Sequence, residues 1–457
     1  METTRSSVAT PAERRAIVIG GSIAGLLAAR VLADRYAEVV VLERDDLPEH
    51  AAARIGTPHA IHPHGLLARG LQVLEELFPG FTDALLAQGA QPGDIGFEVS
   101  VEADERRFAR STIGTTGVAA SRLLIEGELR RRVREWPRVR VLSGIGVLAP
   151  THEAGRVTGV HLQRTGAAAE TWPAALVVDC TGRGSRSPVW LRDWGYGSPT
   201  EEGVTIGLAY TSAYFRRDTL LDGEPSVVVG SATPTLPRPY VLIAQEPDEQ
   251  GRARWVAGVG GYAGDHVETA LEALRRRAEE VGSREIAALA DEAKLLSPVM
   301  TYNFQRSQRW RYERMRKFPD GFLVMGDALA SFNPIYGQGM TVAACEALAL
   351  RDALSEAPER PATRFFAAAA KIIDVPWQMA VGGDLALPQV PGPRPLPVRL
   401  TNAYIARVRR AAMDDPVVAA AFVRVMHLLA PPPTLMAPAL MWRVLRHRVD
   451  RRPSKDE

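Results

Sequence analysis

The chain has 457 residues, of which 46% are hydrophobic and 24% are charged, and its formal net charge is +2. This length predicts two or three domains of an ordinary globular protein. The small net charge gives no indication of binding to nucleic acid or to an anionic membrane surface.

The cysteines and the N-terminal residues bear on the cellular setting. Cys180 and Cys345 have no CxxC partner and indicate a reduced, cytoplasmic protein. Residues 1–15 are polar and run directly into an apolar strand, so we expect no signal peptide. A spanning helix needs roughly 18 apolar residues. The best candidate, residues 416–442, is interrupted by an arginine, a histidine and prolines, so we expect no transmembrane segment.

Residues 16–45 predict a strand, a tight turn, a helix and a second strand. The turn reads Gly20-Gly21-Ser22-Ile23-Ala24-Gly25, and Ser22 stands where a dinucleotide-binding GxGxxG turn has its middle glycine. Gly20 permits the turn, a small residue at 22 lets the backbone approach a diphosphate, and Gly25 lets the helix pack on the strand. The helix start offers free N–H groups and the positive end of its dipole. The sequence therefore predicts a dinucleotide site here, although a glycine turn without a ligand is the alternative.

Glu43 ends the second strand, where a carboxylate can accept hydrogen bonds from ribose hydroxyls. An acid at this position favours FAD or NAD over NADP, which needs a base for its 2′-phosphate. The adjacent Arg44 is a further candidate contact of the cofactor.

The middle of the chain alternates between helical and strand patterns. We expect helices over 64–90 and 121–136, strands over 92–109 and 175–182, and a hairpin from Val139 to Gln163. Alternating strands with aromatic residues over 203–262 predict an antiparallel sheet in a separate layer. A helix over 267–282, a strand over 321–327, a helix over 339–356 and a proline-interrupted helical tail complete the pattern.

A second glycine-rich segment, residues 321–342, distinguishes FAD from NAD. A buried strand ends in Gly326-Asp327, and after Pro334 a helix begins at Gly337-Gln338-Gly339. Asp327 can bond a polyol, and the helix start can stabilise the anionic N1 and C2 carbonyl region of a reduced flavin. The alternative is an ordinary strand-to-helix turn.

Three segments resemble the flavin-dependent monooxygenases of the aromatic-hydroxylase superfamily. GDALASFNPIYGQGMTVAA is similar to their second FAD motif, SRLLIEGELRRRV to their arginine-containing helix start, and LVVDCTGRGSRSPVWL to their middle motif. The resemblance implies that Asp327 contacts the ribityl chain, that Pro334 lies near the flavin face and that Arg122 contacts FAD. In the middle motif, the matching residues are Asp179, Thr181, Gly182 and Arg186.

The subgroup is indicated by SFNPIYGQGM and by ARIGTPHAIHPHGLLARGLQVLEELFPG. Both look closest to squalene-epoxidase-like bacterial enzymes, including epoxidases of polyene chains in polyether natural products. Arg54 and His64 match that subgroup, and Arg54 is carried over as an FAD contact. His59 stands where the subgroup usually has glutamine.

The predicted cofactor contacts combine the motifs and the resemblance. We expect Pro334, Gly337 and Gln338 near the flavin ring, with no catalytic protein nucleophile and no metal site. The cofactor contacts are Gly20, Gly21, Ser22, Ala24, Gly25, Glu43, Arg44, Arg54, Arg122, Asp179, Gly182, Gly326, Asp327, Pro334, Gly337, Gly339 and Met340.

The resemblance also implies the fold. We expect an α/β protein with a Rossmann-type FAD-binding domain of the glutathione-reductase kind, interleaved with an antiparallel-sheet substrate domain. The FAD-binding domain is predicted over 14–90, 117–190 and 294–357, the substrate domain over 91–116 and 191–293, and a helical C-terminal region over 358–457.

The implied activity is that of an FAD-dependent monooxygenase. Reduced FAD and O2 form a C4a-hydroperoxide, which inserts one oxygen atom into a small apolar substrate, and we favour epoxidation of an alkene in a polyketide or terpenoid. A hydroxylase of an aromatic or aliphatic substrate, an FAD-dependent reductase of a prenyl chain and a non-enzymatic flavin carrier are the alternatives. Halogenation is disfavoured, because the chain has no lysine before Lys294 and no Trp-x-Trp-x-Ile-Pro segment.

The sequence does not distinguish between two routes by which electrons reach the flavin. The family members that NADPH reduces directly usually carry an Asp-Gly pair in the middle motif, whereas this chain has Asp179-Cys180-Thr181-Gly182 and no second dinucleotide turn. NAD(P)H therefore reduces the flavin either directly or through a separate flavin reductase.

Candidates for the substrate side lie in one loop and on the predicted sheet. His59, His62 and His64 cluster in a loop, and we interpret them as neighbours of FAD or substrate rather than metal ligands. The aromatic residues proposed to line the substrate pocket, with core packing as the alternative, are Tyr210, Tyr214, Phe215 and Trp255. We expect the tail around 417–445 to cap an apolar pocket rather than touch a membrane.

Overall fold

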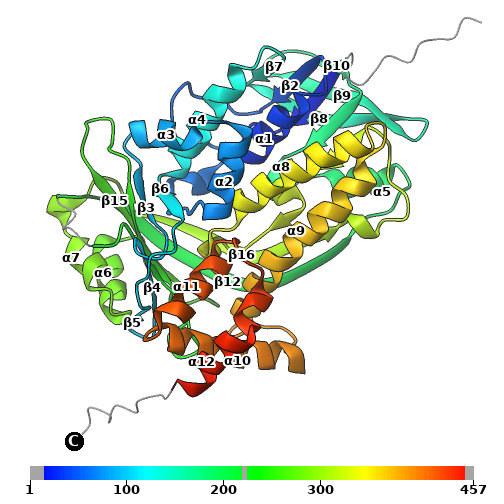
Figure 1. The fold of residues 1–457 in the computed structure, drawn as a ribbon. Coiled ribbons are helices and arrows are strands. Elements are labelled where there is room, and N and C mark those ends of the chain that lie inside the picture. Colours follow the sequence, from blue (N-terminus) through cyan, green and yellow to red (C-terminus); the bar gives the residue numbers. More distant parts are fainter. Residues whose placement is uncertain (1–14, 219–223, 448–457) are drawn as a thin grey trace, which may run out of the picture.

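The computed structural model describes residues 15–218 and 224–447 (Figure 1). The polar N-terminal stretch that bears on the signal-peptide prediction lies almost entirely outside the described residues. A five-stranded parallel sheet forms the centre of the cofactor half, and its strands are apolar because both faces are covered. In spatial order they are β17 (Phe322–Val324), β11 (Leu176–Asp179), β1 (Arg15–Ile19), β2 (Glu38–Leu42) and β7 (Val139–Leu142).

The edge strand β7 corrects one prediction. Residues 139–142 were expected within a hairpin, but they pair in parallel with β2. The hairpin itself begins at Ile145 and forms a three-stranded antiparallel sheet. Its strands are β8 (Ile145–Glu153), β9 (Arg156–Arg164) and β10 (Ala169–Pro173). A parallel partner distant in sequence leaves no local pattern, so this pairing could not be predicted from neighbouring residues.

Helices from opposite ends of the chain pack together beside the parallel sheet. Figure 1 shows α8 (Gly339–Glu356) beside α1 (Ile23–Leu32) and beside the long α9 (Pro361–Asp384). Alanines on α8 such as Ala344 and Ala347 are fully buried and allow this close approach. Further helices are α2 (Ala68–Leu77), α3 (Phe81–Ala87), α4 (Arg122–Arg134) and α5 (Ser187–Asp193).

A second, eight-stranded sheet forms the other half of the fold. In spatial order its strands are β18 (Ala330–Ser331), β16 (Met300–Arg311), β12 (Thr200–Arg216), β15 (Arg254–Gly261), β14 (Tyr240–Gln245), β13 (Val227–Gly230), β4 (Val99–Ala103) and β5 (Arg106–Arg107). Helices α6 (Leu271–Glu280) and α7 (Arg284–Leu289) supply apolar residues to a core cluster shared with this sheet. A two-stranded sheet pairs β3 (Gln91–Asp94) with β6 (Thr116–Ala119).

The predicted fold class is confirmed: a Rossmann-type parallel sheet is interleaved with a second sheet and followed by C-terminal helices. The second sheet is mixed rather than purely antiparallel, because β13 pairs in parallel with β4. The long strand β16 was not predicted, and it pairs with β12 although it lies in the range 294–357 assigned to the cofactor domain. We propose that residues 300–311 belong with the second sheet, and the other domain boundaries stay predictions.

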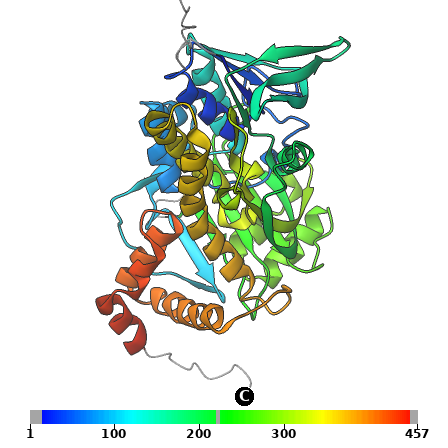
Figure 2. The same cartoon turned by 90° about the vertical axis from the view of Figure 1, so that its right-hand side faces the viewer.

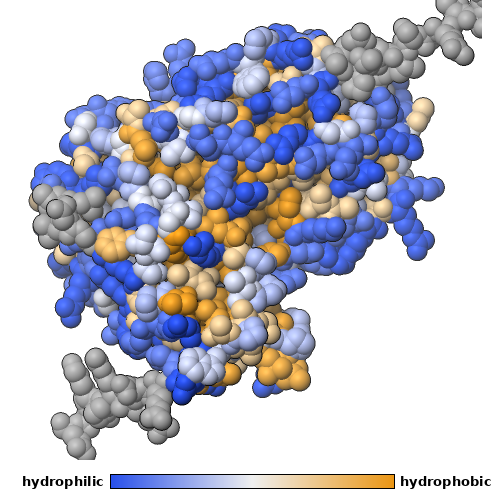
Figure 3. Space-filling model, viewed as in Figure 1, coloured by the Kyte–Doolittle hydropathy of each residue, from blue (hydrophilic) through white to orange (hydrophobic). Residues whose placement is uncertain are grey.

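The C-terminal helices form a separate layer at the bottom of the molecule in Figures 1 and 2. Helices α10 (Leu396–Ala412), α11 (Pro416–Met426) and α12 (Pro438–Arg446) pack on β4 and its neighbouring loop through one apolar cluster. Figure 3 shows apolar side chains on the exposed side of this layer too. Among the residues of these helices and their connecting segments, Leu396, Met436 and Trp442 are each more than half exposed.

No helix within residues 15–218 and 224–447 is long and apolar enough to cross a membrane.

The contact of Gly25 with the preceding turn gives a testable expectation. A Cβ on Gly25 would lie 1.9 Å from the carbonyl oxygen of Gly20, whereas a Cβ on Gly184 would meet no atom within 4 Å. We expect Gly25→Ala to lower the free energy of unfolding by about 1–3 kcal/mol or more, and Gly184→Ala to change it by no more than about 0.5 kcal/mol. Urea denaturation followed by circular dichroism measures both. Equal stability of the two variants would show that the turn is not packed as described.

Candidate functional site

The glycine turn after β1 is held by backbone contacts that exclude side chains. Gly20 has a φ of +105°, its N–H donates to the carbonyl of Leu42, and a Cβ there would lie 2.6 Å from the carbonyl oxygen of Cys180. A Cβ on Gly326 would lie 2.6 Å from the Cβ of Ala24. The first and second glycine motifs, about three hundred residues apart, are therefore adjacent at the start of α1.

A cluster of charges surrounds this turn, with Arg54 at its centre. Glu43 is buried, its Oε2 accepts the N–H of Gly21 at 2.8 Å, and the same oxygen lies 3.1 Å from Nη1 of Arg54. Arg54 also pairs with Asp45 at 3.2 Å and with Glu126 at 3.0 Å. Burial lowers the pKa of Arg54, but the charges of Glu126 and Glu43 outweigh it and the net pKa is raised. The guanidinium thus stays charged and fixes the Glu43 side chain against the turn.

Glu126, on α4, is a member of this cluster that sequence reasoning missed. It accepts the hydroxyl of Ser22 at 2.7 Å and lies 3.5 Å from Arg122, whose Nη2 donates to Ser22 at 3.0 Å. The spacing Arg122-x-x-x-Glu126 is a helical ion-pair spacing, and it was the available signal. Arg44, by contrast, has a side chain 75% exposed and only a 3.9 Å contact with Asp45, so its role stays a prediction.

Two observations indicate that Asp327 lies in a recess of the surface. Asp327 is exposed to solvent. Desolvation by the surrounding protein nevertheless raises the pKa of its carboxyl group, although the charges of Arg122 and Arg183 lower it. Solvent can therefore reach this carboxyl group although dense protein surrounds it, as expected for a group in a recess. Cβ positions built on Gly339 and Gly182 would approach Asp327 within 3.9 Å and 4.0 Å. The second and middle motifs therefore converge on this carboxylate.

The carboxylate of Asp179 is occupied by hydrogen bonds within its own loop. It is fully buried, Oδ1 accepts the N–H and the hydroxyl of Thr181, and Oδ2 accepts the hydroxyls of Ser185 and Ser187. These bonds saturate the carboxylate and close the loop that carries Gly182. Asp179 therefore shapes the loop, and its contact with a cofactor stays a prediction.

Glu346 on α8 holds the backbone of the second glycine motif in place. It is fully buried, and its Oε2 accepts the N–H of Gly326 at 2.7 Å. Burial raises its pKa to about 8, more than the bond from Gly326 lowers it. The side chain is therefore mainly protonated at neutral pH.

The loop before α8 is fastened by a residue from the tail. Oδ1 of Asp384, the last residue of α9, accepts Nδ2–H of Asn333 at 2.7 Å, the hydroxyl of Tyr336 at 3.1 Å and that of Tyr262 at 3.2 Å. Burial raises the pKa of Asp384 to about 6. The contact fixes Pro334 between two anchored residues. Sequence reasoning missed it because Asp384 lies in a helix with no motif of its own.

An aromatic cluster faces the recess from the other sheet. Its members are His59 and His62 from the loop that contains the 3-10 helix η2 (Pro58–Ile61), with Tyr210 of β12 and Tyr302 of β16. Their ring centroids lie 5.1–5.8 Å apart. The two tyrosines are register partners on adjacent strands. This aromatic wall connects the loop between β2 and α2 with the second sheet.

The two histidines of the aromatic wall and the neighbouring His64 are uncharged at neutral pH. Desolvation lowers the pKa of His59 to about 3 and that of His62 to about 4, and it holds the pKa of His64 well below its usual value. Nδ1 of His62 lies 2.7 Å from Oγ of Ser212. The wall therefore offers neutral rings and no charge of its own.

The structure does not bring two of the predicted substrate contacts to the aromatic wall. Phe215 and Trp255 are register partners on one face of the second sheet, where they pack against Leu274 and Ala278 of α6. Side chains alternate along a strand, so Phe215 faces away from the side that Tyr214 and Tyr210 face. Tyr214 is buried and supports the loop, because its hydroxyl donates to the carbonyl of Ile61 at 2.8 Å. Of the four aromatic residues, Tyr210 alone lies in the aromatic wall.

The arrangement fits FAD. Glycines occupy the positions where side chains would block close approach, and Asp327 lies in the recess at the start of α8. Nε of Arg122 and Oε1 of Gln338 are buried without a partner among the described residues, as expected of groups that bind a ligand. The residues that would hold FAD are the turn 20–25 and Glu43 for the ADP part, Asp327 for the ribityl chain, and the loop 334–339 for the ring.

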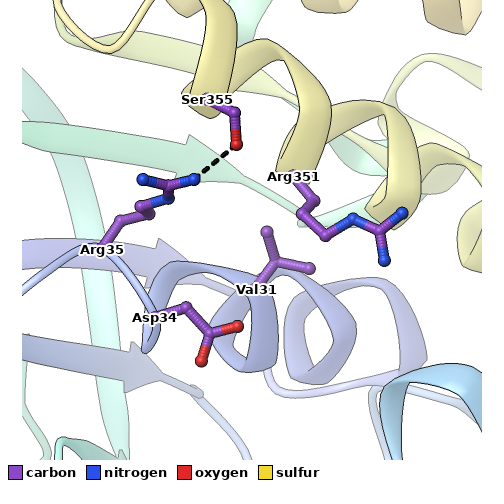
Figure 4. A pocket seen from close by; sticks show the side chains of 5 residues that line it. All are labelled: Val31, Asp34, Arg35, Arg351 and Ser355. Atoms are coloured by element: carbon purple, nitrogen blue, oxygen red, sulfur yellow. Dashed lines mark hydrogen bonds between the residues drawn. The ribbon is translucent and has the colours of Figure 1, made fainter.

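Two other features lie outside this site. No group of three or more His, Cys, Asp or Glu side chains in the described part of the chain is placed to hold a metal ion. A hollow lined by Val31, Asp34, Arg35, Arg351 and Ser355 lies at the C-terminal ends of α1 and α8 (Figure 4). The N-terminal ends of these helices form the site, and a ten-residue helix is about 15 Å long. The hollow is therefore separate.

Comparison with known proteins agrees with the motifs. Residues 13–364 match the family described as FAD binding domain. Protein Rv3254 of Mycobacterium tuberculosis is 36% identical over 436 residues, which cover 91% of this chain and 89% of that protein.

Three solved structures share the fold. A flavoprotein/dehydrogenase from Cytophaga hutchinsonii has a TM-score of 0.65 at 17% identity, covering 90% of this chain and 92% of that one. The flavin-dependent brominase Bmp2 has a TM-score of 0.63 at 14% identity, covering 91% and 93%. The 2-methyl-3-hydroxypyridine-5-carboxylic acid oxygenase has a TM-score of 0.60 at 18% identity, covering 91% and 98%. At these identities the likeness shows the fold alone.

The Arg54 cluster predicts a large effect of one substitution. Arg54→Met leaves the buried Glu43 and Glu126 without their cation, which costs about 3–5 kcal/mol for a broken buried pair. We expect that loss in urea denaturation, together with weaker FAD binding in a fluorescence titration. The control Arg140→Met removes an exposed pair with Glu38 and should cost less than about 1 kcal/mol. Equal stability of the two variants would contradict the description of the cluster.

Glu346 predicts a pH dependence of stability. Its pKa is about 8 in the folded protein against a model-peptide value of 4.5, so the folded state holds a proton that the unfolded state releases. The stability from this group is fully present below pH 4.5 and is lost as the pH rises through about 8, by up to about 1.4 kcal/mol per pH unit. Glu346→Gln should therefore gain stability relative to the natural protein between pH 5 and 8 in urea titrations. A difference that does not change with pH would contradict a protonated Glu346.

Proposed function

The chain belongs to the family described as FAD binding domain, and from this premise we propose that it is an FAD-dependent monooxygenase that inserts one atom of O2 into a small apolar substrate. The observation that carries the proposal is the meeting, in one recess, of the cofactor motifs around Asp327 with the uncharged aromatic wall. Bound reduced FAD would supply the two electrons and activate O2. The chain's own residues would bind the cofactor and the substrate, orient them, and exclude water.

The cofactor half of the recess would orient the flavin. The start of α8 presents free N–H groups, and the anchors of Asn333 and Tyr336 on Asp384 hold the adjoining loop in one position. A helix start placed against the ring would stabilise negative charge on the reduced flavin. The geometry therefore favours a cofactor that cycles through an anionic reduced form.

The substrate half provides a dry, uncharged surface. Tyr210 and Tyr302 have pKa values raised by burial, and His59 and His62 are neutral above about pH 4. Such a surface suits an alkene or an aromatic ring rather than a strongly hydrated group. Oxygen transfer to either needs no protein nucleophile.

Epoxidation of an alkene in a polyketide or terpenoid is our favoured reaction, because two segments of the chain resemble polyene epoxidases. In the balanced reaction, alkene, O2, two electrons and two protons give the epoxide and water. Hydroxylation of an aromatic ring is the second candidate, which the tilted and edge-on rings of the aromatic wall favour. NAD(P)H would supply the electrons, directly or through a flavin reductase as partner.

The test is isotope transfer from O2. The FAD-loaded protein is reduced without oxygen and mixed with 18O2 and a panel of terpenoid alkenes, polyketide alkenes and aromatic compounds. We expect a product that gains one 18O atom, with the second in water, and magnetic resonance separates an epoxide from an alcohol.

Two results would contradict the proposal. A product that gains two hydrogens and no oxygen would indicate a reductase of prenyl chains. Complete conversion of O2 to hydrogen peroxide with every compound would indicate that the recess does not transfer oxygen.

A further inference from the structure

Arg183 is a cation in the recess that the cofactor motifs do not use. It belongs to the 3-10 helix η3 (Gly182–Gly184) and its side chain is exposed. Its Nη1 donates to Oγ of Ser331 at 3.0 Å, and its guanidinium carbon lies 4.4 Å from the centroid of the Phe304 ring. Its position is therefore fixed by one hydroxyl and one aromatic ring of the second sheet.

The charge of Arg183 acts on the carboxyl of Asp327, but the two groups form no ion pair. None of the ion pairs within the described ranges includes Arg183, and only its Nη1 has a hydrogen-bond partner there. Arg54, in the same site, has three carboxylates around it. An exposed, positioned guanidinium with Nε and Nη2 unoccupied can still accept a carboxylate in its bidentate geometry.

The charge of Arg183 acts on the substrate half of the recess. It opposes the burial-induced rise in the pKa of Tyr302 and of Asp327, and it adds to the lowering of the pKa of His59. Phe304, under the guanidinium, belongs to an apolar cluster that also contains Tyr210, Tyr302 and Ile335. A cation thus stands at the edge of an uncharged aromatic and aliphatic surface.

We propose that Arg183 binds the carboxylate of the substrate, so that the substrate class is an unsaturated organic acid with an apolar body. This rests on the proposed function, because it places the substrate against Tyr210 and Tyr302. The carboxylate would bind Nε and Nη2, while Ser331 and Phe304 hold the guanidinium in place. The apolar body would then lie along the aromatic wall, toward the loop 334–339.

The experiment compares acids with their neutral amides. FAD-loaded protein is titrated with sorbate, cinnamate and geranate and with the three corresponding amides, and dissociation constants are read from the change in flavin absorbance without any turnover. We expect at least one acid to bind about tenfold or more tightly than its amide, the effect of a charge-assisted hydrogen bond. In Arg183→Met this preference should disappear, and in Arg183→Lys part of it should remain.

Controls separate this proposal from the others. Arg192→Met removes an exposed arginine of α5 that contacts its neighbour Asp193, and it should keep the full preference. FAD affinity is measured first in every variant, and we expect Arg183→Met to bind FAD as the natural protein does. The readout is binding, so a failure of oxygen transfer leaves it unaffected, and absence of the flavin band would be seen before any acid is added.

Three results would overturn the proposal. If no acid of the panel binds the natural protein more tightly than its amide, Arg183 does not select acids. If Arg183→Met keeps the preference, another group binds the carboxylate. If Arg183→Met loses FAD as Arg54→Met is expected to, the cation serves the cofactor.

Discussion

The site depends on three glycines whose surroundings leave no room for a side chain. Gly20 lies against the carbonyl of Cys180, Gly25 against the carbonyl of Gly20, and Gly326 against Ala24. These contacts join the ends of β1, β11 and β17, which are neighbours in the parallel sheet. The carboxyl ends of parallel strands share one edge of a sheet, where open α/β folds bind their ligands. The start of α1, the recess at Asp327 and the start of α8 meet there for that reason.

The two halves of the recess differ in electrostatics, and the difference matches two tasks. Around the turn, Arg54 balances buried carboxylates, so that Glu43 keeps a fixed position as an acceptor. On the opposite side, burial keeps the histidines neutral and leaves an uncharged wall. A charged dinucleotide and an apolar organic molecule need these two environments next to each other. Arg183 is the exception on the substrate side, and this contrast makes its charge informative.

The sequence was sufficient for features that local patterns encode. The βαβ unit, both glycine motifs and the layer of strands over 203–262 follow from periodicity and from glycine positions. Long-range pairings were not visible: β7 and β16 form with partners far along the chain, and Glu126, Glu346 and Asp384 act on motifs in other elements. Strand alternation could have separated Phe215 from Tyr214, but the buried face of a sheet with core on both sides is not marked in the sequence. Asp179 sat in a matching motif, yet its four internal bonds give it a structural role.

The most direct test of the account is a crystal structure of the protein with FAD bound. We predict the diphosphate at the start of α1, the ribityl chain beside Asp327, and the flavin ring between the loop 334–339 and the aromatic wall of His59, His62, Tyr210 and Tyr302. A ring bound away from that wall, or a ribityl chain that does not approach Asp327, would contradict the central claim that the two halves of the recess form one site.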